Sequence, residues 1–152
     1  MEQCTTVVGL DVHKNTIVTA VLPPGSERVV EQQMLENGPK AIEPMVTRVA
    51  QRGPVVFVYE AGPCGSEVHR QITALGQRCV VIAPSLTPRR PGDRVKTDRR
   101  DAEKLARLYR AGELTTIRVP TREEEAARDL VRVREDGLTD RLRARHRLSK
   151  FL

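Results

Sequence analysis

Short apolar runs separated by turn-forming residues dominate the beginning of the chain. Residues 7–11 (VVGLD) and 16–22 (TIVTAVL) are rich in β-branched side chains, and the polar triplet at 13–15 between them is typical of a hairpin turn. A second turn at 23–26 (PPGS) precedes residues 28–35, which can supply a third strand. The pattern therefore predicts three antiparallel strands at the start of the chain.

Helical and strand patterns alternate in the next part of the chain. Apolar residues at helical spacing predict a helix that ends near residue 52, before the Gly-Pro pair at 53–54. Residues 55–59 (VVFVY) are continuously apolar, as in a strand that is buried on both faces of a sheet. A helix at 66–75 and a strand at 79–83 follow. This order predicts an α/β fold in which helices flank a mixed five-stranded sheet.

A proline-containing loop and two helices make up the rest of the pattern. The loop spans 84–97, and a strong helix is expected over 98–111. Residues 115–119 are either a short edge strand or simply extended. The last helix is highly charged, and its apolar stripe is broken, so it does not look like part of the main core. We therefore expect one domain over 1–119 and the start of a helical, coiled-coil linker over 120–152.

Composition restricts the class of protein. Hydrophobic residues make up 39% and charged residues 30% of the chain, as in a soluble globular protein. With 3% aromatic residues and no Trp, a base-stacking platform is not expected. The net charge of +6 favours a polyanionic partner, or serves only solubility. No signal peptide and no apolar run of about 20 residues are present, which predicts a cytoplasmic protein with no membrane segment.

The three cysteines give no sign of a disulfide framework or a zinc site. Cys4, Cys64 and Cys79 are far apart and odd in number. The default expectation is that all three are buried, reduced thiols.

Two aspartates on the helix at 98–111 suggest a metal site. At about 100° per residue, Asp98 and Asp101 share the apolar face of the helix, and its basic residues lie on the other face. Desolvating two neighbouring carboxylates is unfavourable unless a cation compensates, and Mg²⁺ prefers carboxylate oxygen. The alternative is purely structural, with Asp98 as the N-cap and Asp101 in the first turn, where the helix dipole favours acids.

Two further acids each follow a strongly apolar strand. Asp11 ends the first strand and Glu60 ends the fourth. If these strands are neighbours in a mixed sheet, their ends converge with the start of the helix that carries the aspartate pair. Four such carboxylates can hold two divalent cations about 3.5–4 Å apart and support in-line phosphoryl displacement. His13 lies close to Asp11 in sequence, but at a hairpin turn a structural or solvated role is expected.

Basic residues surround this helix and the loop before it. A cationic rim of this kind suits a phosphate backbone, although a solvated helix face is the alternative. The residues expected to bind nucleic acid are Arg89, Arg90, Arg94, Lys96, Arg99, Arg100 and Lys104. Arg107 and Arg110, further along the helix, belong to the same basic stretch.

Three sequence blocks resemble the DEDD-type insertion-sequence transposases, a group that includes the Piv-like DNA invertases. The blocks are VVGLDVHK around Asp11, VYEAG around Glu60 and GDRVKTDRRDAEKLARL around Asp98 and Asp101. They occur in order over nearly the whole chain, and KTDRRDA is the most specific of them. The N-terminal domain of this family is similar to the RuvC-like Holliday-junction resolvases.

The resemblance implies a set of functional properties. Asp11, Glu60, Asp98 and Asp101 would form the acidic tetrad on an RNase H-like, RuvC-like fold. Mg²⁺, for which Mn²⁺ can substitute, would support DNA strand cleavage and transfer. It further implies a coiled-coil extension, homo-oligomers formed through the C-terminal helix, and a structured guide or bridge RNA as a second partner.

One departure from the family keeps a second interpretation open. Family members continue into a C-terminal domain that supplies a serine, and nothing here matches that domain, so a truncated chain is expected. The alternative is that such a chain acts only as a nucleic-acid-binding or assembly module. Actin-like ATPases and sugar kinases share the core fold, but their glycine-rich phosphate loops are absent from the sequence.

Overall fold

The computed structural model describes residues 4–87 and 98–151, and the chain divides into two compact units, 1–118 and 119–152. The first unit contains a five-stranded sheet with strand order β3-β2-β1-β4-β5. Residues 88–97, which contain most of the loop that the sequence predicts, lie outside the described residues.

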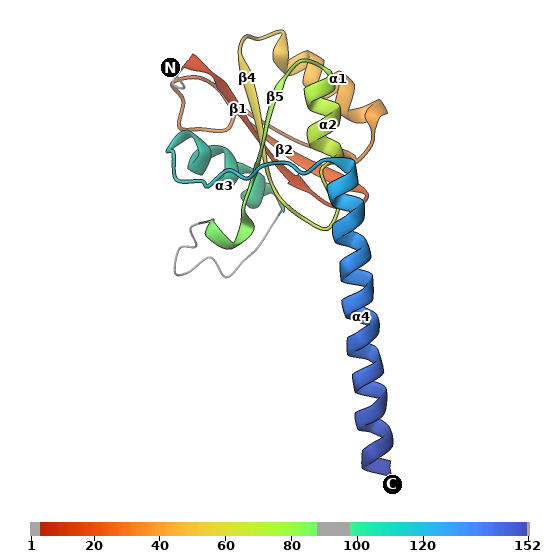
Figure 1. The fold of residues 1–152 in the computed structure, drawn as a ribbon. Coiled ribbons are helices and arrows are strands. Elements are labelled where there is room, and N and C mark those ends of the chain that lie inside the picture. The colour runs from red at the N-terminus through yellow and green to blue at the C-terminus, as the bar shows by residue number, and fades with distance from the viewer. Residues whose placement is uncertain (1–3, 88–97, 152) are drawn as a thin grey trace. The chain divides into compact units, whose positions relative to one another are not determined.

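The sheet joins an antiparallel meander to two parallel strands (Figure 1). Strands β1 (Thr6–Val12), β2 (Thr16–Leu22) and β3 (Glu31–Glu36) are antiparallel neighbours. Strands β4 (Val55–Glu60) and β5 (Arg78–Ile82) are added in parallel on the other side of β1. The predicted α/β, RNase H-like mixed sheet with flanking helices is therefore confirmed.

The third strand starts later than the apolar pattern suggests. The hydroxyl of Ser26 accepts a hydrogen bond from the Arg28 amide and donates one to the Arg28 carbonyl, so the backbone turns there before it enters the sheet. Residues 115–117 pair with the outer edge of β5 through one antiparallel bridge, Ile82 to Thr116, and two flanking hydrogen bonds. This segment is thus an extended chain with a single bridge.

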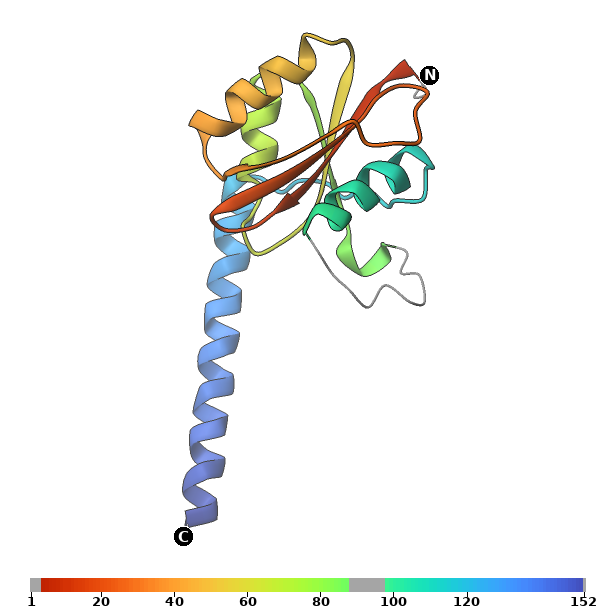
Figure 2. The same cartoon turned by 180° about the vertical axis from the view of Figure 1, so that it is seen from behind.

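Helices cover both faces of the sheet (Figures 1 and 2). Helices α1 (Pro39–Ala50) and α2 (Glu67–Ala74) lie on one face, and α3 (Asp98–Arg110) lies on the other. A short 3₁₀ helix, η2 (Pro84–Leu86), follows β5. The three α-helices on the sheet bury their apolar stripes: α1 buries Ile42, Met45, Val46 and Val49, α2 buries Val68 and Ile72, and α3 buries Ala102, Leu105, Ala106 and Tyr109.

The alternation of side chains along a strand decides which residues face α3. Val7 of β1 and Val56 and Val58 of β4 pack in one cluster with Leu105 and Tyr109 of α3. Odd-numbered positions of β1 and even-numbered positions of β4 therefore point toward this helix.

The backbone of α3 lies directly against β1 at Gly9. A β-carbon at this position would lie 1.9 Å from the carbonyl oxygen of Ala102 and 3.0 Å from the amide nitrogen of Ala106. Only glycine permits this approach, because any side chain would collide with helix backbone. The contact sets how closely α3 sits over the strand that carries Asp11.

Arg110 fastens the other end of α3 to the sheet. Its Nη1 donates hydrogen bonds to the carbonyls of Pro23 (2.6 Å) and Ser26 (2.7 Å), and its Nη2 donates to those of Leu22 (2.8 Å) and Thr5 (3.2 Å). Helical spacing predicts Arg110 on the outer, solvated face and in the basic rim. That placement is wrong, because the long side chain reaches back under the end of the helix to backbone carbonyls.

The cysteines are free thiols, as predicted, but they are not all buried. Cys4 is exposed because it lies ahead of β1, and Cys64 and Cys79 are partly buried. Burial raises the pKa of the Cys79 thiol to about 12, so this group stays protonated at neutral pH.

The second unit consists of helix α4 (Arg122–Phe151) and the residues that lead into it. Its start is a capping box, in which the Glu124 amide donates to the Thr121 hydroxyl and the Thr121 amide donates to the Glu124 carboxylate. None of its described residues is buried within this chain. In the part of the chain that the structure describes, no helix is long and apolar enough to cross a membrane.

Candidate metal centre

Strand register places Asp11 and Glu60 side by side. β1 and β4 run parallel, and their last matched pair is Leu10 with Tyr59. Asp11 and Glu60 are the next pair along the two strands. Asp11 is at an odd-numbered position of β1 and Glu60 at an even-numbered position of β4, so both lie on the face of the sheet that α3 covers. Both are at the carboxyl ends of their strands. The predicted convergence of these two strand ends thus follows from the sheet topology.

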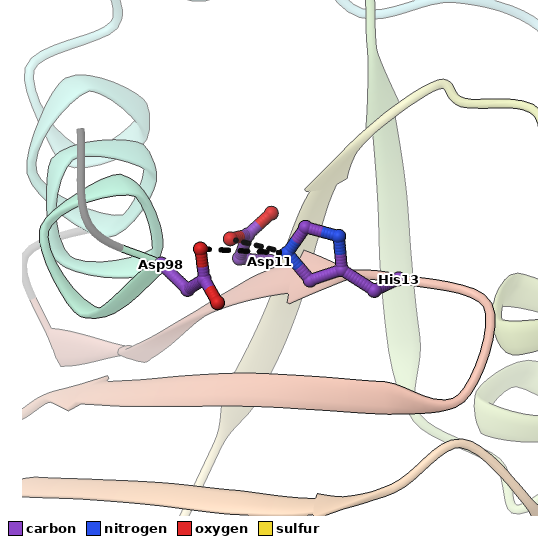
Figure 3. Close-up of side chains that lie close together, drawn as sticks. All are labelled: Asp11, His13 and Asp98. Atoms are coloured by element: carbon purple, nitrogen blue, oxygen red, sulfur yellow. Dashed lines mark hydrogen bonds and ion pairs between the residues drawn. The ribbon is translucent and has the colours of Figure 1, made fainter.

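Helix α3 brings a third carboxylate to the same place. It starts at Asp98 beside the end of β1 and finishes at Arg110 beside the start of that strand. His13 Nε2 lies 3.1 Å from Asp11 Oδ2 and 3.7 Å from Asp98 Oδ1 (Figure 3). Ligand atoms of Asp11, His13 and Asp98 all lie within 4.8 Å of one another. This cluster is the candidate metal centre.

Asp101 and Glu60, the other two predicted ligands, lie outside this three-residue cluster. Asp101 is partly buried on α3, and its charge acts on the Asp11 carboxylate. Glu60 is partly buried at the end of β4. Among the residues described, neither belongs to the set whose ligand atoms all lie within 4.8 Å of one another.

His13 is the site residue that sequence reasoning missed. It was expected to be structural or solvated, yet its imidazole is turned toward both aspartates. The available signal was its spacing from Asp11, because residues two apart at a strand end share a face. The side chain of His13 is 49% exposed, compared with 21% for Asp11 and 53% for Asp98.

The electrostatics of Asp11 favour a bound cation. Burial raises the pKa of the Asp11 carboxyl above its usual value, and repulsion from Asp98 and Asp101 adds to this, while the charge and hydrogen bond of His13 lower it. A divalent cation would offset both unfavourable effects. The carboxylate oxygens of this set suit Mg²⁺ or Mn²⁺.

Only part of the predicted basic rim lies in the described structure. Arg99 and Arg100 are exposed in the first turn of α3, next to the candidate metal centre, and Lys104 is partly buried one turn further on. Arg107 forms an ion pair with Glu103, so it is not a free cation. The remaining predicted rim residues lie outside the described residues: Arg89, Arg90, Arg94 and Lys96.

Replacing Asp11 with Asn should stabilise the metal-free protein. Because the folded-state pKa of Asp11 is raised, the unfolded chain releases this proton at lower pH than the folded chain does. Stability therefore falls as pH rises from the usual Asp range through the raised pKa, and the penalty remains at neutral pH. With EDTA at pH 7, we expect Asp11→Asn to gain about 0.5–1 kcal/mol in urea unfolding.

The gain should shrink as pH falls below the usual range of Asp. Asp98→Asn is the matched control, since water already solvates the more exposed Asp98 and its replacement should change stability less. If Asp11→Asn is destabilising at pH 7, burial and charge repulsion do not disfavour the ionised Asp11 carboxylate in the folded protein.

Known proteins similar to this chain are transposases. Residues 8–152 match the sequence model of the IS110-type DEDD transposase family, described as Transposase. The chain is 44% identical over 149 residues to the putative transposase y4qE of Sinorhizobium fredii, which covers 95% of this chain and 38% of that protein. It is 37% identical over 147 residues to the transposase for insertion sequence element IS1533 of Leptospira borgpetersenii, which covers 95% of this chain and 42% of that protein.

A solved structure shows a looser likeness. It is a Thermus thermophilus RuvC structure, with a TM-score of 0.49 and 13% sequence identity, matched over 74% of this chain and 99% of that one. The chain spans about two-fifths of the length of the two curated relatives named above. On the family match over residues 8–152, this chain belongs to the IS110-type DEDD transposase family.

Proposed function

We propose that this chain is the metal-dependent nuclease part of a DNA transposase. Asp11, Glu60, Asp98 and Asp101 would hold Mg²⁺, with Mn²⁺ as a substitute, and would support DNA strand cleavage and transfer. The observation that carries the proposal is the convergence of Asp11 and Asp98 at the carboxyl end of β1, beside the register position of Glu60. The transposase names of the relatives point to the same chemistry.

The residues of the chain have separate tasks in this proposal. Asp11 and Glu60 project from neighbouring strands of the sheet core, so their backbones are rigid. Asp98 and Asp101 come from the first turn of α3, which Gly9 and Arg110 hold against the sheet. Two cations held here would activate an attacking water or hydroxyl and stabilise the leaving oxygen of the phosphodiester.

DNA would approach along the exposed first turn of α3. Arg99 and Arg100 lie on this turn beside the aspartates, so contacts to phosphates would position the scissile strand without reading its sequence. We assign the same role to Lys104 and to the basic residues of the preceding loop, Arg89, Arg90, Arg94 and Lys96. A structured guide RNA would use the same phosphate chemistry and is part of the proposal.

Helix α4 is proposed as the start of a coiled-coil linker that forms homo-oligomers. It exposes several large apolar side chains that nothing within its own unit covers. These residues are Leu130 (72% exposed), Val131 (53%), Val133 (69%), Leu138 (38%), Leu142 (53%), Leu148 (61%) and Phe151 (91%).

Metal binding is the first test of the proposed function. Titration of Mn²⁺ and of Mg²⁺ into the full chain, followed by calorimetry, should show saturable binding. Asp11→Asn should lower the affinity at least about a hundredfold, because it removes a carboxylate of the cluster that is only 21% exposed. Glu113→Gln, at an exposed position after α3, is the control and should bind like the parent.

Cleavage of a branched DNA in Mn²⁺ distinguishes the nuclease from a binding module. A nuclease should cut, and Asp11→Asn should abolish the cutting while DNA binding persists. If the chain binds DNA equally well with and without metal and never cuts, the non-catalytic module is the better description of this chain. If the metal affinity of Asp11→Asn equals that of the parent, the proposed carboxylate site is wrong.

A further inference from the structure

His13 offers a nitrogen ligand at a site otherwise built from carboxylates. Its Nε2 is the atom that approaches both aspartates, at 3.1 Å from Asp11 and 3.7 Å from Asp98. Ligands about 2.1 Å from one ion lie about 3 Å apart when they occupy adjacent octahedral positions. The separations of His13 Nε2 from the two aspartates are therefore near those of ligands that share one ion (Figure 3).

The backbone around His13 is held in place by hydrogen bonds. The His13 amide donates to the Thr16 carbonyl at 2.9 Å, which closes the hairpin between β1 and β2. Asn37, directly after β3, donates from its side chain to the His13 carbonyl (2.8 Å) and from its amide to the Asn15 carbonyl (2.9 Å). These hydrogen bonds hold the turn that carries the half-exposed imidazole, so His13 can bind an ion without a rearrangement of the loop.

Ligand chemistry gives this nitrogen a specific consequence. Mg²⁺ binds oxygen and keeps much of its water, whereas imidazole suits transition metals such as Mn²⁺ better. A site with carboxylates alone distinguishes the two ions less strongly. An imidazole in direct contact with the ion would therefore raise the preference for Mn²⁺ over Mg²⁺.

We propose that His13 Nε2 is a direct metal ligand alongside Asp11 and Asp98, and that it determines the preference of the site for Mn²⁺ over Mg²⁺. The proposal rests on the proposed function, since it concerns the same metal centre. It adds a nitrogen ligand to the four carboxylates.

The test compares the two metals in the full chain. His13→Ala should lower Mn²⁺ affinity on the order of tenfold while Mg²⁺ affinity changes much less, so that the ratio of the two constants falls. Pulsed electron paramagnetic resonance of bound Mn²⁺ should show coupling to a ¹⁴N nucleus in the parent and none in His13→Ala. His146→Ala, which removes an exposed histidine of α4, is the matched control and should change neither result.

Each outcome separates this inference from the proposed function. If Asp11→Asn loses the metal but His13→Ala keeps the parent ratio and shows no change in nitrogen coupling, the carboxylate site stands and His13 is not a ligand. Tighter Mn²⁺ binding in His13→Ala would likewise overturn the inference, because the imidazole would then compete with the ion. If the parent binds neither metal, both proposals fall together.

Discussion

Gly9→Ala is expected to destabilise the first unit by about 3 kcal/mol and to weaken metal binding on the order of tenfold. In an open strand the same change would be favourable by roughly 0.5–1 kcal/mol, because alanine restricts the unfolded chain. Here the new methyl carbon would lie 1.9 Å from the Ala102 carbonyl oxygen. Since that atom is helix backbone, no side-chain rotation can relieve the clash, and α3 must move away from β1.

Metal affinity should follow because α3 carries Asp98 and Asp101. A displaced helix increases their separation from Asp11, which stays on the strand. Urea unfolding gives the stability, and calorimetry with Mn²⁺ gives the affinity. Gly62→Ala is the control, since the nearest atom to its β-carbon would be the Glu60 carbonyl oxygen at 3.9 Å. A Gly9→Ala protein as stable as the parent would show that α3 does not rest on β1 as described.

Arg110→Met should destabilise the protein by about 2–4 kcal/mol. The guanidinium donates to four backbone carbonyls, of Thr5, Leu22, Pro23 and Ser26. Methionine matches much of its length but has no donor, so partly buried carbonyls lose the hydrogen bonds that Arg110 donates, and bonds from a charged donor are among the stronger ones. Chemical unfolding at neutral pH measures the loss.

Arg107→Met provides the comparison on the same helix. Arg107 is 51% exposed and forms an ion pair with Glu103 one turn away, so its loss should change stability by about 0.5 kcal/mol or less. Arg110→Lys should fall between the two variants, because an ammonium group cannot reach four carbonyls in the guanidinium geometry. Equal effects of Arg107→Met and Arg110→Met would mean that the hydrogen bonds of Arg110 do not fasten α3.

The sequence by itself determined the features that depend on local periodicity. Apolar runs at 7–11 and 55–59 predicted β1 and β4, and helical spacing predicted α1 and α3 close to their observed bounds. Period-2 and period-3.6 patterns are properties of neighbouring residues, so a single sequence contains them. The acids at the strand ends were visible for the same reason, and the three sequence blocks identified the transposase family that the comparison then showed.

Only the tertiary structure decided which atoms meet. His13 joins Asp11 and Asp98 because the turn after β1 lies beside the start of α3, 85 residues later in the numbering. Arg110 was assigned to the solvated face because helical spacing describes one helix alone, whereas its partners lie 84 to 105 residues away. Gly9 likewise gave no signal, since a close approach between two backbones has no period. Contacts of this kind arise from the packing of α3 on the sheet, and a one-dimensional pattern does not encode that packing directly.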